Sequence, residues 1–245
     1  LLDQELWKQV KSYSLSEEAQ GLEGPEKRLL EELVADFTEA GADLPEDKRA
    51  RLEKLSSELA LATQKFSENV LDSTNAWQKL IEDESLLAGL PESARIAARE
   101  AARQKEKEGW LFTLHAPSIM PLMKYLDDDS IRREVWEAST KIAWQGERDN
   151  TDLIRRILEL RQEKAEVLGK RDYADVVLER RMAGSGARAD EFVSELKDKT
   201  AKAFGLENEA LAAFKAEKTG SSPEALEPWE AVYWVEKQMQ EKFDF

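Results

Sequence analysis

Apolar residues recur every three or four positions through a long segment that contains neither glycine nor proline. They are Leu52, Leu55, Leu59, Ala62, Phe66 and Val70. This spacing places them on one narrow face of a helix that opens after Pro45, and charged residues flank that face. Glycine (11) and proline (7) are scarce in the 245 residues, and 36% of the residues are charged. The sequence therefore predicts a mainly α fold, a multi-helix scaffold with long antiparallel helices.

Other segments have the same helical spacing. We expect helices over 24–40, closed by Gly41, from Pro91 to before Gly109, from about Ser130, and from Asn150 or Thr151 to Gly169. A further helix is expected from about 188 towards 218, and a closing helix after Pro228. The predicted buried stripe of the helix after residue 150 consists of Leu153, Ile154, Ile157, Leu158, Ala165 and Leu168.

The segment Trp110–Leu114 (WLFTL) differs from this pattern, because it is short and rich in aromatic and β-type residues. We expect one or two short strands near 110–114. Pro117 and Pro121 should then keep the following stretch extended or turned before a new helix forms. This change of texture divides the chain into an N-terminal helical hairpin region, 1–109, and a second region, 110–245, of a short strand followed by helices.

Charge and composition exclude several classes of function. The formal net charge of -15 argues against nucleic acid and anionic membrane partners. The chain has no cysteine, and no apolar run is long enough to span a membrane. The first residues do not resemble a secretory signal, so a cytoplasmic location is the default expectation.

Residues that could carry chemistry are few. The single histidine, His115, cannot form a zinc site that needs two histidines and a third ligand, and no nucleophile-elbow pattern accompanies it. We interpret it as structural or solvent-facing. The run Asp127-Asp128-Asp129 could attract a hard cation, but it lacks the spacing of a calcium loop. A solvated loop with favourable charge at a helix start is the better interpretation.

Two further patterns also fail to define a site. The Gly184–Gly186 stretch (GSG) follows a helix rather than a strand, so it does not predict a phosphate loop. The seven tryptophans are expected mainly in a helical core, with aromatics lining a ligand channel as the alternative. The sequence thus predicts no catalytic, cofactor-binding or metal-binding residue in this chain.

Five stretches together resemble the oligopeptidase A and thimet oligopeptidase family of zinc metallopeptidases. They are LPEDKRARLEKLSSELALATQKFSENVLDSTNAW (44–77), LLAGLPESA, the run from WLFTLHAPSIMP to DDDSIRREVWEAS, NTDLIRRILELRQEKAEVLGKRDYADVVLERRMA (150–183) and EPWEAVYWVEKQ. The fourth is the most specific, with Leu-x-x-Arg, Ala-x-x-Leu-Gly, Tyr-Ala-Asp and Met-Ala in family order. The likeness runs from about Pro25 to the last residue. Glu230 and Trp234 depart from the usual Asp and Tyr.

The resemblance implies a parent enzyme that hydrolyses short peptides with zinc bound by a His-Glu-x-x-His motif and a downstream glutamate. No residue of this chain matches those elements. The resemblance therefore implies that the chain supplies N-terminal scaffold and channel wall, with the strand near Trp110 towards the cleft. We expect it to be inactive and zinc-free alone, with a missing C-terminal catalytic domain and short peptides as partners of the complete enzyme.

The two ends of the chain fit this expectation of a truncated protein. The first residue is not methionine, and the closing helix carries an aromatic surface that would be left without a partner: Trp229, Tyr233, Trp234, Phe243 and Phe245. Two alternatives stay open. One is a catalytically dead helical interaction or scaffold protein, and the other is a protein that dimerises through the Leu52–Val70 face.

Overall fold

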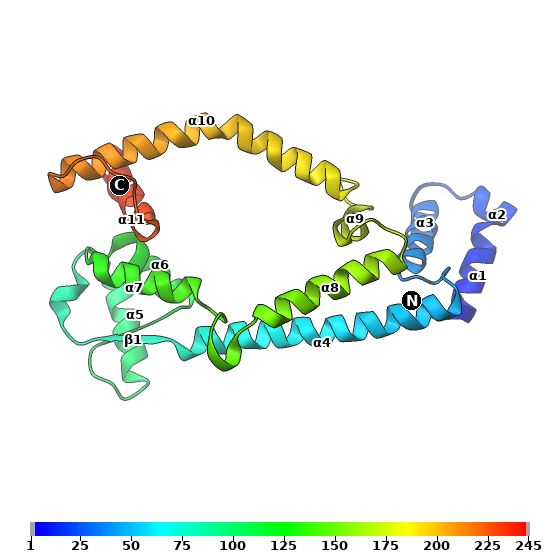
Figure 1. The fold of residues 1–245 in the computed structure, drawn as a ribbon, viewed down its shortest axis with the longest axis horizontal. Coiled ribbons are helices and arrows are strands. Elements are labelled where there is room, and N and C mark those ends of the chain that lie inside the picture. Colours follow the sequence, from blue (N-terminus) through cyan, green and yellow to red (C-terminus); the bar gives the residue numbers. More distant parts are fainter. Residues whose placement is uncertain (1–2, 244–245) are drawn as a thin grey trace. The chain divides into compact units, whose positions relative to one another are not determined.

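A computed structural model describes residues 3–243, and these residues form eleven α-helices and one two-stranded sheet (Figure 1). The mainly α fold is confirmed. The chain divides into two compact units, each made of two separate segments. Unit 1 comprises the residues up to Lys65 together with Asp152–Ser194, and unit 2 comprises Phe66–Thr151 together with Glu195 and the residues after it. The division of the chain into regions 1–109 and 110–245 stays a prediction.

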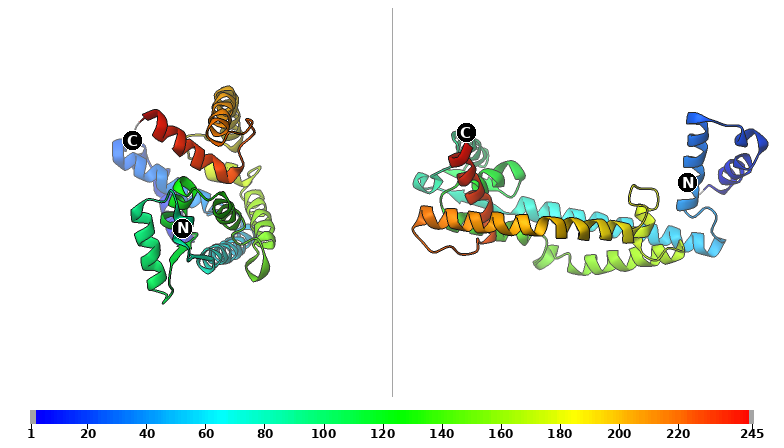
Figure 2. Two further views of the ribbon diagram at one scale, coloured as in Figure 1. Left: turned by 90° about the vertical axis from the view of Figure 1, so that its left-hand side faces the viewer. Right: turned by 90° about the horizontal axis from the view of Figure 1, so that it is seen from above.

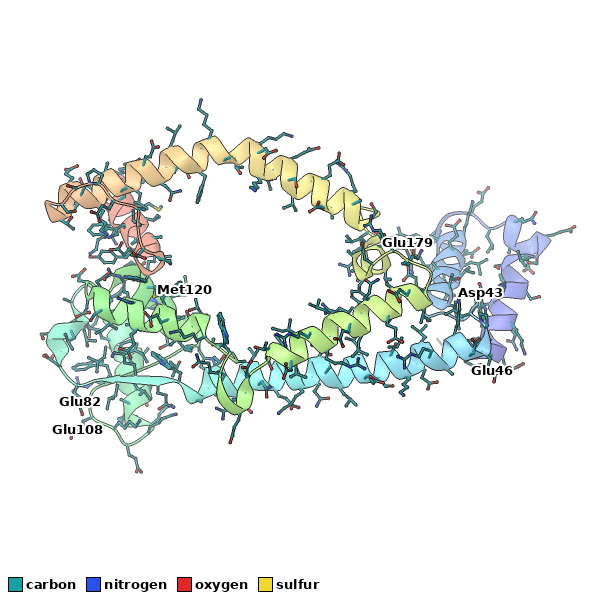
Figure 3. All side chains as sticks on the ribbon, viewed as in Figure 1. Asp43, Glu46, Glu82, Glu108, Met120 and Glu179 are labelled. Atoms are coloured by element: carbon teal, nitrogen blue, oxygen red, sulfur yellow. The ribbon has the colours of Figure 1, made fainter. Side chains whose placement is uncertain are left out.

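Unit 1 begins with three short helices, α1 (Gln4–Ser14), α2 (Glu17–Gln20) and α3 (Gly24–Glu39). The Asp3 and Ser16 side chains cap α1 and α2 by accepting backbone N–H groups that the first turn leaves free. The rings of Trp7 and Phe37 stack at 5.3 Å, and the Trp7 indole N–H donates to Asp43, which lies in the turn after α3 (Figure 3). This stacked pair is the centre of a small core between α1 and α3.

The long helix α4 (Glu46–Ala76) forms as the apolar spacing predicts. Its first half lies beside α8 (Thr151–Val167) in unit 1, as the views in Figures 1 and 2 agree. Arg51 bonds to Glu163, and seven residues later Glu58 bonds to Arg156, so the two helices are antiparallel. Leu52 and Leu55 are buried within unit 1, so this part of the apolar face is not free for a second copy of the chain.

The predicted buried stripe of α8 is only partly correct. Ile157 and Ala165 are buried, but Ile154 and Leu158 are 47% and 58% exposed, and Leu160 is buried instead. The face of α8 that meets α4 is set by the pairs that Arg156 and Glu163 form, and Leu158 lies away from that face. Spacing alone did not fix the rotation of the helix.

In unit 2, β1 (Gln78–Ile81) pairs antiparallel with β2 (Trp110–Thr113), with Gln78 opposite Thr113. The strand expected at 110–114 is confirmed, whereas its partner β1 was not predicted. Gly109 makes the pairing possible, because its φ is +105° and a Cβ there would lie 2.5 Å from the Ile81 carbonyl oxygen. Between the strands lie a 3-10 turn, η1 (Glu84–Leu87), and α5 (Glu92–Arg103).

The expectation that Pro117 and Pro121 delay the next helix is wrong. α6 (Ala116–Tyr125) starts directly after β2, and α7 (Asp129–Thr140) follows it. Pro117 occupies the first turn, where its missing N–H would have no helical partner, and only Pro121 removes an internal bond. Leu122 and Leu126 are fully buried in the core of unit 2, and this burial offsets the cost of Pro121.

The remaining elements are a 3-10 turn, η2 (Gly146–Arg148), a short α9 (Tyr173–Leu178), the long α10 (Gly186–Thr219) and α11 (Pro228–Phe243). Gly169, with φ +72°, ends α8 as predicted. α8 begins at Thr151, as expected, and the Asn150 side chain before it bonds to the Asn69 side chain and to the Phe66 carbonyl. Residues of α10 fall in both units, and α11 packs on α6 and α7 in unit 2.

Candidate functional site

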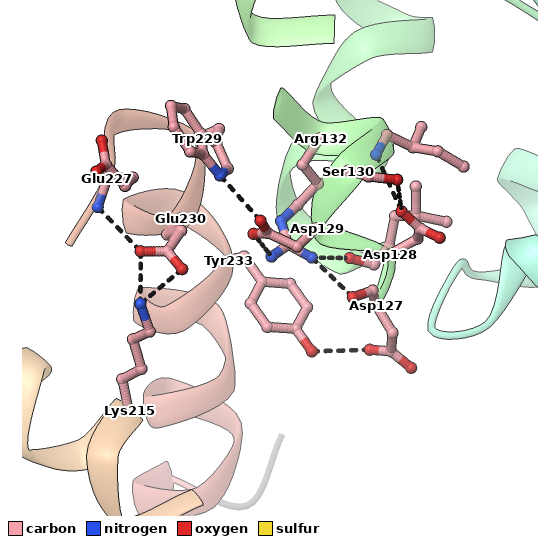
Figure 4. A network of polar contacts seen from close by, with 12 residues as sticks. Asp127, Asp128, Asp129, Ser130, Arg132, Lys215, Glu227, Trp229, Glu230 and Tyr233 are labelled. Atoms are coloured by element: carbon pink, nitrogen blue, oxygen red, sulfur yellow. Dashed lines mark hydrogen bonds and ion pairs between the residues drawn. The ribbon is translucent and has the colours of Figure 1, made fainter. Parts of the chain in front are cut away.

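The acidic run Asp127–Asp129 lies between α6 and α7, where Figure 4 shows it at the centre of a polar network. Asp128 is the N-cap of α7 and accepts hydrogen bonds from the Ser130 hydroxyl (2.6 Å) and the Ile131 N–H (3.0 Å). These donors, the Ser130 hydroxyl first, hold the pKa of the Asp128 carboxyl below its usual range. The prediction that this run supplies charge at a helix start is correct for Asp128.

The other two carboxylates are exposed to solvent, as the sequence suggested, but they also bond to a distant helix. The Tyr233 hydroxyl donates to Asp127 (2.8 Å), and the Trp229 indole N–H donates to Asp129 (3.1 Å), so both carboxylates hold α11 (Figure 4). Lys237 also pairs with Asp127 at 3.1 Å. These donors lie about one hundred residues away in sequence, so local sequence carries no signal for them.

Arg132 brings a positive charge to the same acidic segment. Its side chain is buried, and its guanidinium donates to the carbonyls of Leu126 (2.6 Å) and Asp127 (3.1 Å) and to the Asp129 carboxylate (2.6 Å). The guanidinium also lies 4.0 Å from the centre of the Tyr233 ring. Because cationic side chains already occupy this position, the acidic run does not present an open cluster of oxygen ligands.

Tyr233 is held as a neutral hydrogen-bond donor. Burial, together with the hydrogen bond to the Asp127 carboxylate, raises the pKa of Tyr233 to about 12. Its hydroxyl therefore keeps its proton at neutral pH. As a donor to Asp127, the hydroxyl anchors α11.

Gly89 brings the loop before α5 against the same network. Its φ is +86°, and a Cβ there would lie 2.2 Å from the Tyr125 carbonyl oxygen and 2.7 Å from the Asp127 carboxylate. The neighbouring Ala88 carbonyl accepts from the Asp127 N–H (2.9 Å). Only glycine fits this approach, which gives a physical reason for the glycine in the LLAGLPESA motif.

A second ion pair joins α11 to α10. Lys215 donates to both oxygens of the largely buried Glu230 (2.6 and 2.7 Å), and Glu230 also accepts from the Glu227 N–H (2.9 Å). The ring of Trp234 meets Phe214 edge-on at 6.2 Å. The motif EPWEAVYW thus has a structural role in holding the end of α10 and the start of α11 together.

The aromatic surface of α11 is therefore not left without partners, as the sequence suggested. Trp229 packs on Trp136 at 5.8 Å, Tyr233 is buried, and Trp234 lies against Phe214. The prediction is wrong for these three residues because their partners lie on α7 and α10. Phe243 is 61% exposed, and Phe245 lies outside the described residues.

The other candidates have structural contacts. The His115 ring, at the start of α6, bonds to the Asn75 side chain (2.9 Å) and is exposed. In the Gly184–Gly186 stretch, the Gly186 N–H donates to the Asp175 carboxylate (2.8 Å), which takes the place that a phosphate oxygen would need. Among residues 3–243, no group of three or more histidine, aspartate or glutamate side chains is arranged to hold a metal ion.

The middle of α10, whose residues fall partly in unit 1 and partly in unit 2, carries an exposed apolar surface. Every residue from 190 to 210 on α10 is exposed, and five large apolar side chains share that stretch. Their exposed fractions run from 50% to 68%: Phe192, Val193, Leu196, Phe204 and Leu206. The helical spacing of these residues was visible in the sequence, but their exposure was not. We call them the α10 apolar face.

Within the described residues, then, the fold is a helical framework, and its polar network holds helices together; no metal-binding cluster is found among these residues. The model of Peptidase family M3 matches residues 122–245, just over half of the chain, and includes this network. The chain belongs to peptidase family M3.

Curated relatives agree with this assignment. The chain is 37% identical over 88% of its length to "Oligopeptidase A" of Salmonella typhimurium, of which it covers 32%. It is 36% identical over 89% of its length to "Probable cytosolic oligopeptidase A" of Arabidopsis thaliana, again covering 32%. A "Dipeptidyl carboxypeptidase" of Escherichia coli is 27% identical over 99% of the chain, which covers 36% of that protein. The chain thus spans about a third of the length of these relatives.

Proposed function

We propose that this chain is the helical scaffold and channel-wall part of a zinc-dependent oligopeptidase that hydrolyses short peptides. Its membership of peptidase family M3 and its similarity to oligopeptidases support the peptidase class. The observation that carries the scaffold role is the α10 apolar face, because exposed apolar surface of this kind marks a contact with another protein surface. The proposed partner of this face is a catalytic domain of the same enzyme.

Peptidases of family M3 are zinc metallopeptidases, and the donor set of this chain does not fit that metal. A hydrolytic zinc site takes about three nitrogen, sulfur or carboxylate ligands and keeps one position for water. The only histidine of the chain bonds to Asn75, and the carboxylates of Asp127 and Asp129 are held by α11 and Arg132. We therefore assign the zinc, and the water that it activates, to the proposed catalytic domain.

The proposed location is the cytoplasm. No helix of the described residues is both long and apolar enough to cross a membrane. One of the similar proteins carries the description cytosolic.

The second candidate function is a helical interaction protein without catalysis. The internal packing of Trp229 and Tyr233 favours it, because α11 has its own partners within unit 2. Both candidates use the α10 apolar face, but only the first predicts that a peptidase catalytic domain binds there.

The test is reconstitution. The purified chain is assayed for zinc and for cleavage of a quenched short peptide, alone and after mixing with the part of the Salmonella oligopeptidase A that follows the matched region. We expect neither zinc nor cleavage from the chain alone, and chelator-sensitive cleavage from the mixture. Leu196→Glu with Phe204→Glu should abolish reconstitution, whereas Ser194→Glu, on the side of α10 away from the apolar face, should not.

Stoichiometric zinc or cleavage traced to the chain alone would overturn the proposal. A mixture that stays inactive, with the two parts failing to associate, would favour the interaction protein. The coding sequence after Phe245 gives an independent answer, since a His-Glu-x-x-His motif there supports the peptidase.

A further inference from the structure

A groove of about 580 Å³ runs along one side of the three N-terminal helices of unit 1. Seven of its ten lining residues are apolar or aromatic. The lining consists of Leu6, Gln9, Val10, Tyr13, Glu18, Leu22, Glu26, Leu29, Leu30 and Leu33. Leu6 and Leu29 are 48% and 62% exposed, so much of this apolar surface is open to solvent. The groove lies outside the α6–α7–α11 network and outside the part of the chain that the family model matches.

The positions of the lining residues indicate the shape of a partner that would fit the groove. On α1 they are 6, 9, 10 and 13, and on α3 they are 26, 29, 30 and 33. Both sets follow the spacing i, i+3, i+4, i+7, which is the face that a helix turns towards another helix. Two adjacent helices that each present such a face form the seat for a third helix. At about 1.5 Å per residue, each lined face extends for about 10 Å, or two turns.

The charges around the groove indicate the chemistry of that helix. The two charged lining residues, Glu18 and Glu26, are both acidic, and no ion pair joins either of them to another described residue. The lysines of α1 are occupied elsewhere, because Lys8 pairs with Glu5 and Lys11 pairs with Asp43. An occupant with basic residues beside its apolar face would therefore find two carboxylates free to pair with it.

We propose that this groove binds a basic amphipathic helix of a partner protein. Leucine-type side chains of that helix enter between α1 and α3, and lysine or arginine side chains pair with Glu18 and Glu26. A second copy of this chain is a poor occupant, because both copies carry a net charge of -15. An anionic lipid or fatty acid is disfavoured by the same two carboxylates. The inference does not depend on the proposed peptidase role.

The test uses a pair of synthetic peptides of about 14 residues, long enough to cover two turns with flanking charges. Both carry leucines at i, i+3, i+4 and i+7, and they differ only in having lysine or glutamate beside the leucines. Binding to the full 245-residue chain is measured by fluorescence anisotropy at low ionic strength. We expect the lysine peptide to bind at least about tenfold more tightly than the glutamate peptide.

Variants assign the effect to the groove. Glu18→Lys with Glu26→Lys should reverse the preference between the peptides, and Leu29→Ser with Leu33→Ser should abolish binding of both. Glu17→Lys with Glu31→Lys is the matched control, because it makes the same total charge change at two exposed residues that do not line the groove. Circular dichroism of each variant confirms that the helices are retained.

Three outcomes overturn the proposal. The first is equal affinity for the two peptides, and the second is binding that Leu29→Ser with Leu33→Ser does not change. The third is a dimer of the chain that these serine substitutions dissociate, which would assign the groove to a second copy. Each of these results leaves the reconstitution test of the α10 apolar face unaffected.

Discussion

Unit 2 and the N-terminal helices of unit 1 contain similar apolar residues but bury them to different extents. In unit 2, ten buried residues from β1, β2 and the helices α5 to α7 with their connecting loops form one continuous core. Between α1 and α3, the corresponding cluster contains only Trp7, Phe37 and Ala42. Yet α3 carries the apolar stripe that its sequence predicts, with Leu29 and Leu33 exposed and only Phe37 buried. A stripe of apolar residues therefore predicts a helix, but it does not say that the chain itself covers the stripe.

The largest effect should follow from a cavity in the core of unit 2. Phe112→Ala removes a ring that is 1% exposed, and we expect a loss of about 3–5 kcal/mol in the unfolding free energy of unit 2. The measurement is urea unfolding followed by hydrogen exchange, which separates the two units. Trp7→Ala is the comparison, because it should expose the amides of α1 and α3 while leaving those of unit 2 protected. Equal loss of protection in both units after either substitution would contradict the comparison.

An intermediate effect should follow from breaking the buried pair between α10 and α11. Glu230→Ala leaves Lys215 and the Glu227 N–H without their acceptor, and we expect a loss of about 1–3 kcal/mol in unit 2. Arg103→Ala, also in unit 2, is the control, because its pair with Glu100 is exposed to solvent and should not measurably affect stability. If the two substitutions lower the unfolding free energy equally, the Lys215–Glu230 pair does not stabilise the attachment of α11.

A smaller effect should appear at alkaline pH. Because the folded pKa of Tyr233 is raised to about 12, folding favours its protonated form. The stability from this shift is fully present below about pH 10, the unfolded value, and is lost as the pH rises towards 12. Between pH 9 and pH 12, the thermal unfolding temperature should therefore fall more steeply for the native chain than for Tyr233→Phe. Identical pH profiles would show that burial and the Asp127 contact do not raise the pKa of Tyr233.

The smallest effect should come from the exposed stripe itself. Leu29→Ser changes a side chain that is 62% exposed, so the unfolding free energy of unit 1 should change by no more than about 0.5 kcal/mol. The same substitution at Leu55, which is fully buried in unit 1, should destabilise it severalfold more. A large loss at Leu29 would mean that the groove is closed in solution.

Local features of the fold were predictable, and contacts between distant segments were not. The spacing around Leu52 predicted α4, and the composition of 110–114 predicted β2. β1 was missed because Gln78–Ile81 has only two apolar residues and pairs with a strand about thirty residues later. The helix through Pro121 was missed because the hydrogen bond that a proline removes from a helix favours an extended chain locally. Burial of Leu122 and Leu126 stabilises the helix despite this cost.

The polar network shows the same division. The capping role of Asp128 could be read from its neighbours, because a capping residue bonds within one turn. The roles of Asp127 and Asp129 depend on Tyr233 and Trp229, which only the folded chain brings near. The sequence around Pro228 resembles the family, and these contacts give a physical reason for its tryptophan and tyrosine. The absence of a catalytic site from this chain stays a prediction.

The exposed middle of α10 has a consequence for cooperativity. From residue 190 to 210 no residue is buried, and Gly205 in this stretch has nothing within 4 Å of the position of a Cβ. Such a stretch has the stability of an isolated peptide helix, which forms and melts turn by turn in less than about a microsecond. We therefore expect this stretch to unfold locally, without unfolding of either core. A surface that binds the α10 apolar face would convert it from a fluctuating helix into a cooperative one, so that association and ordering become a single event.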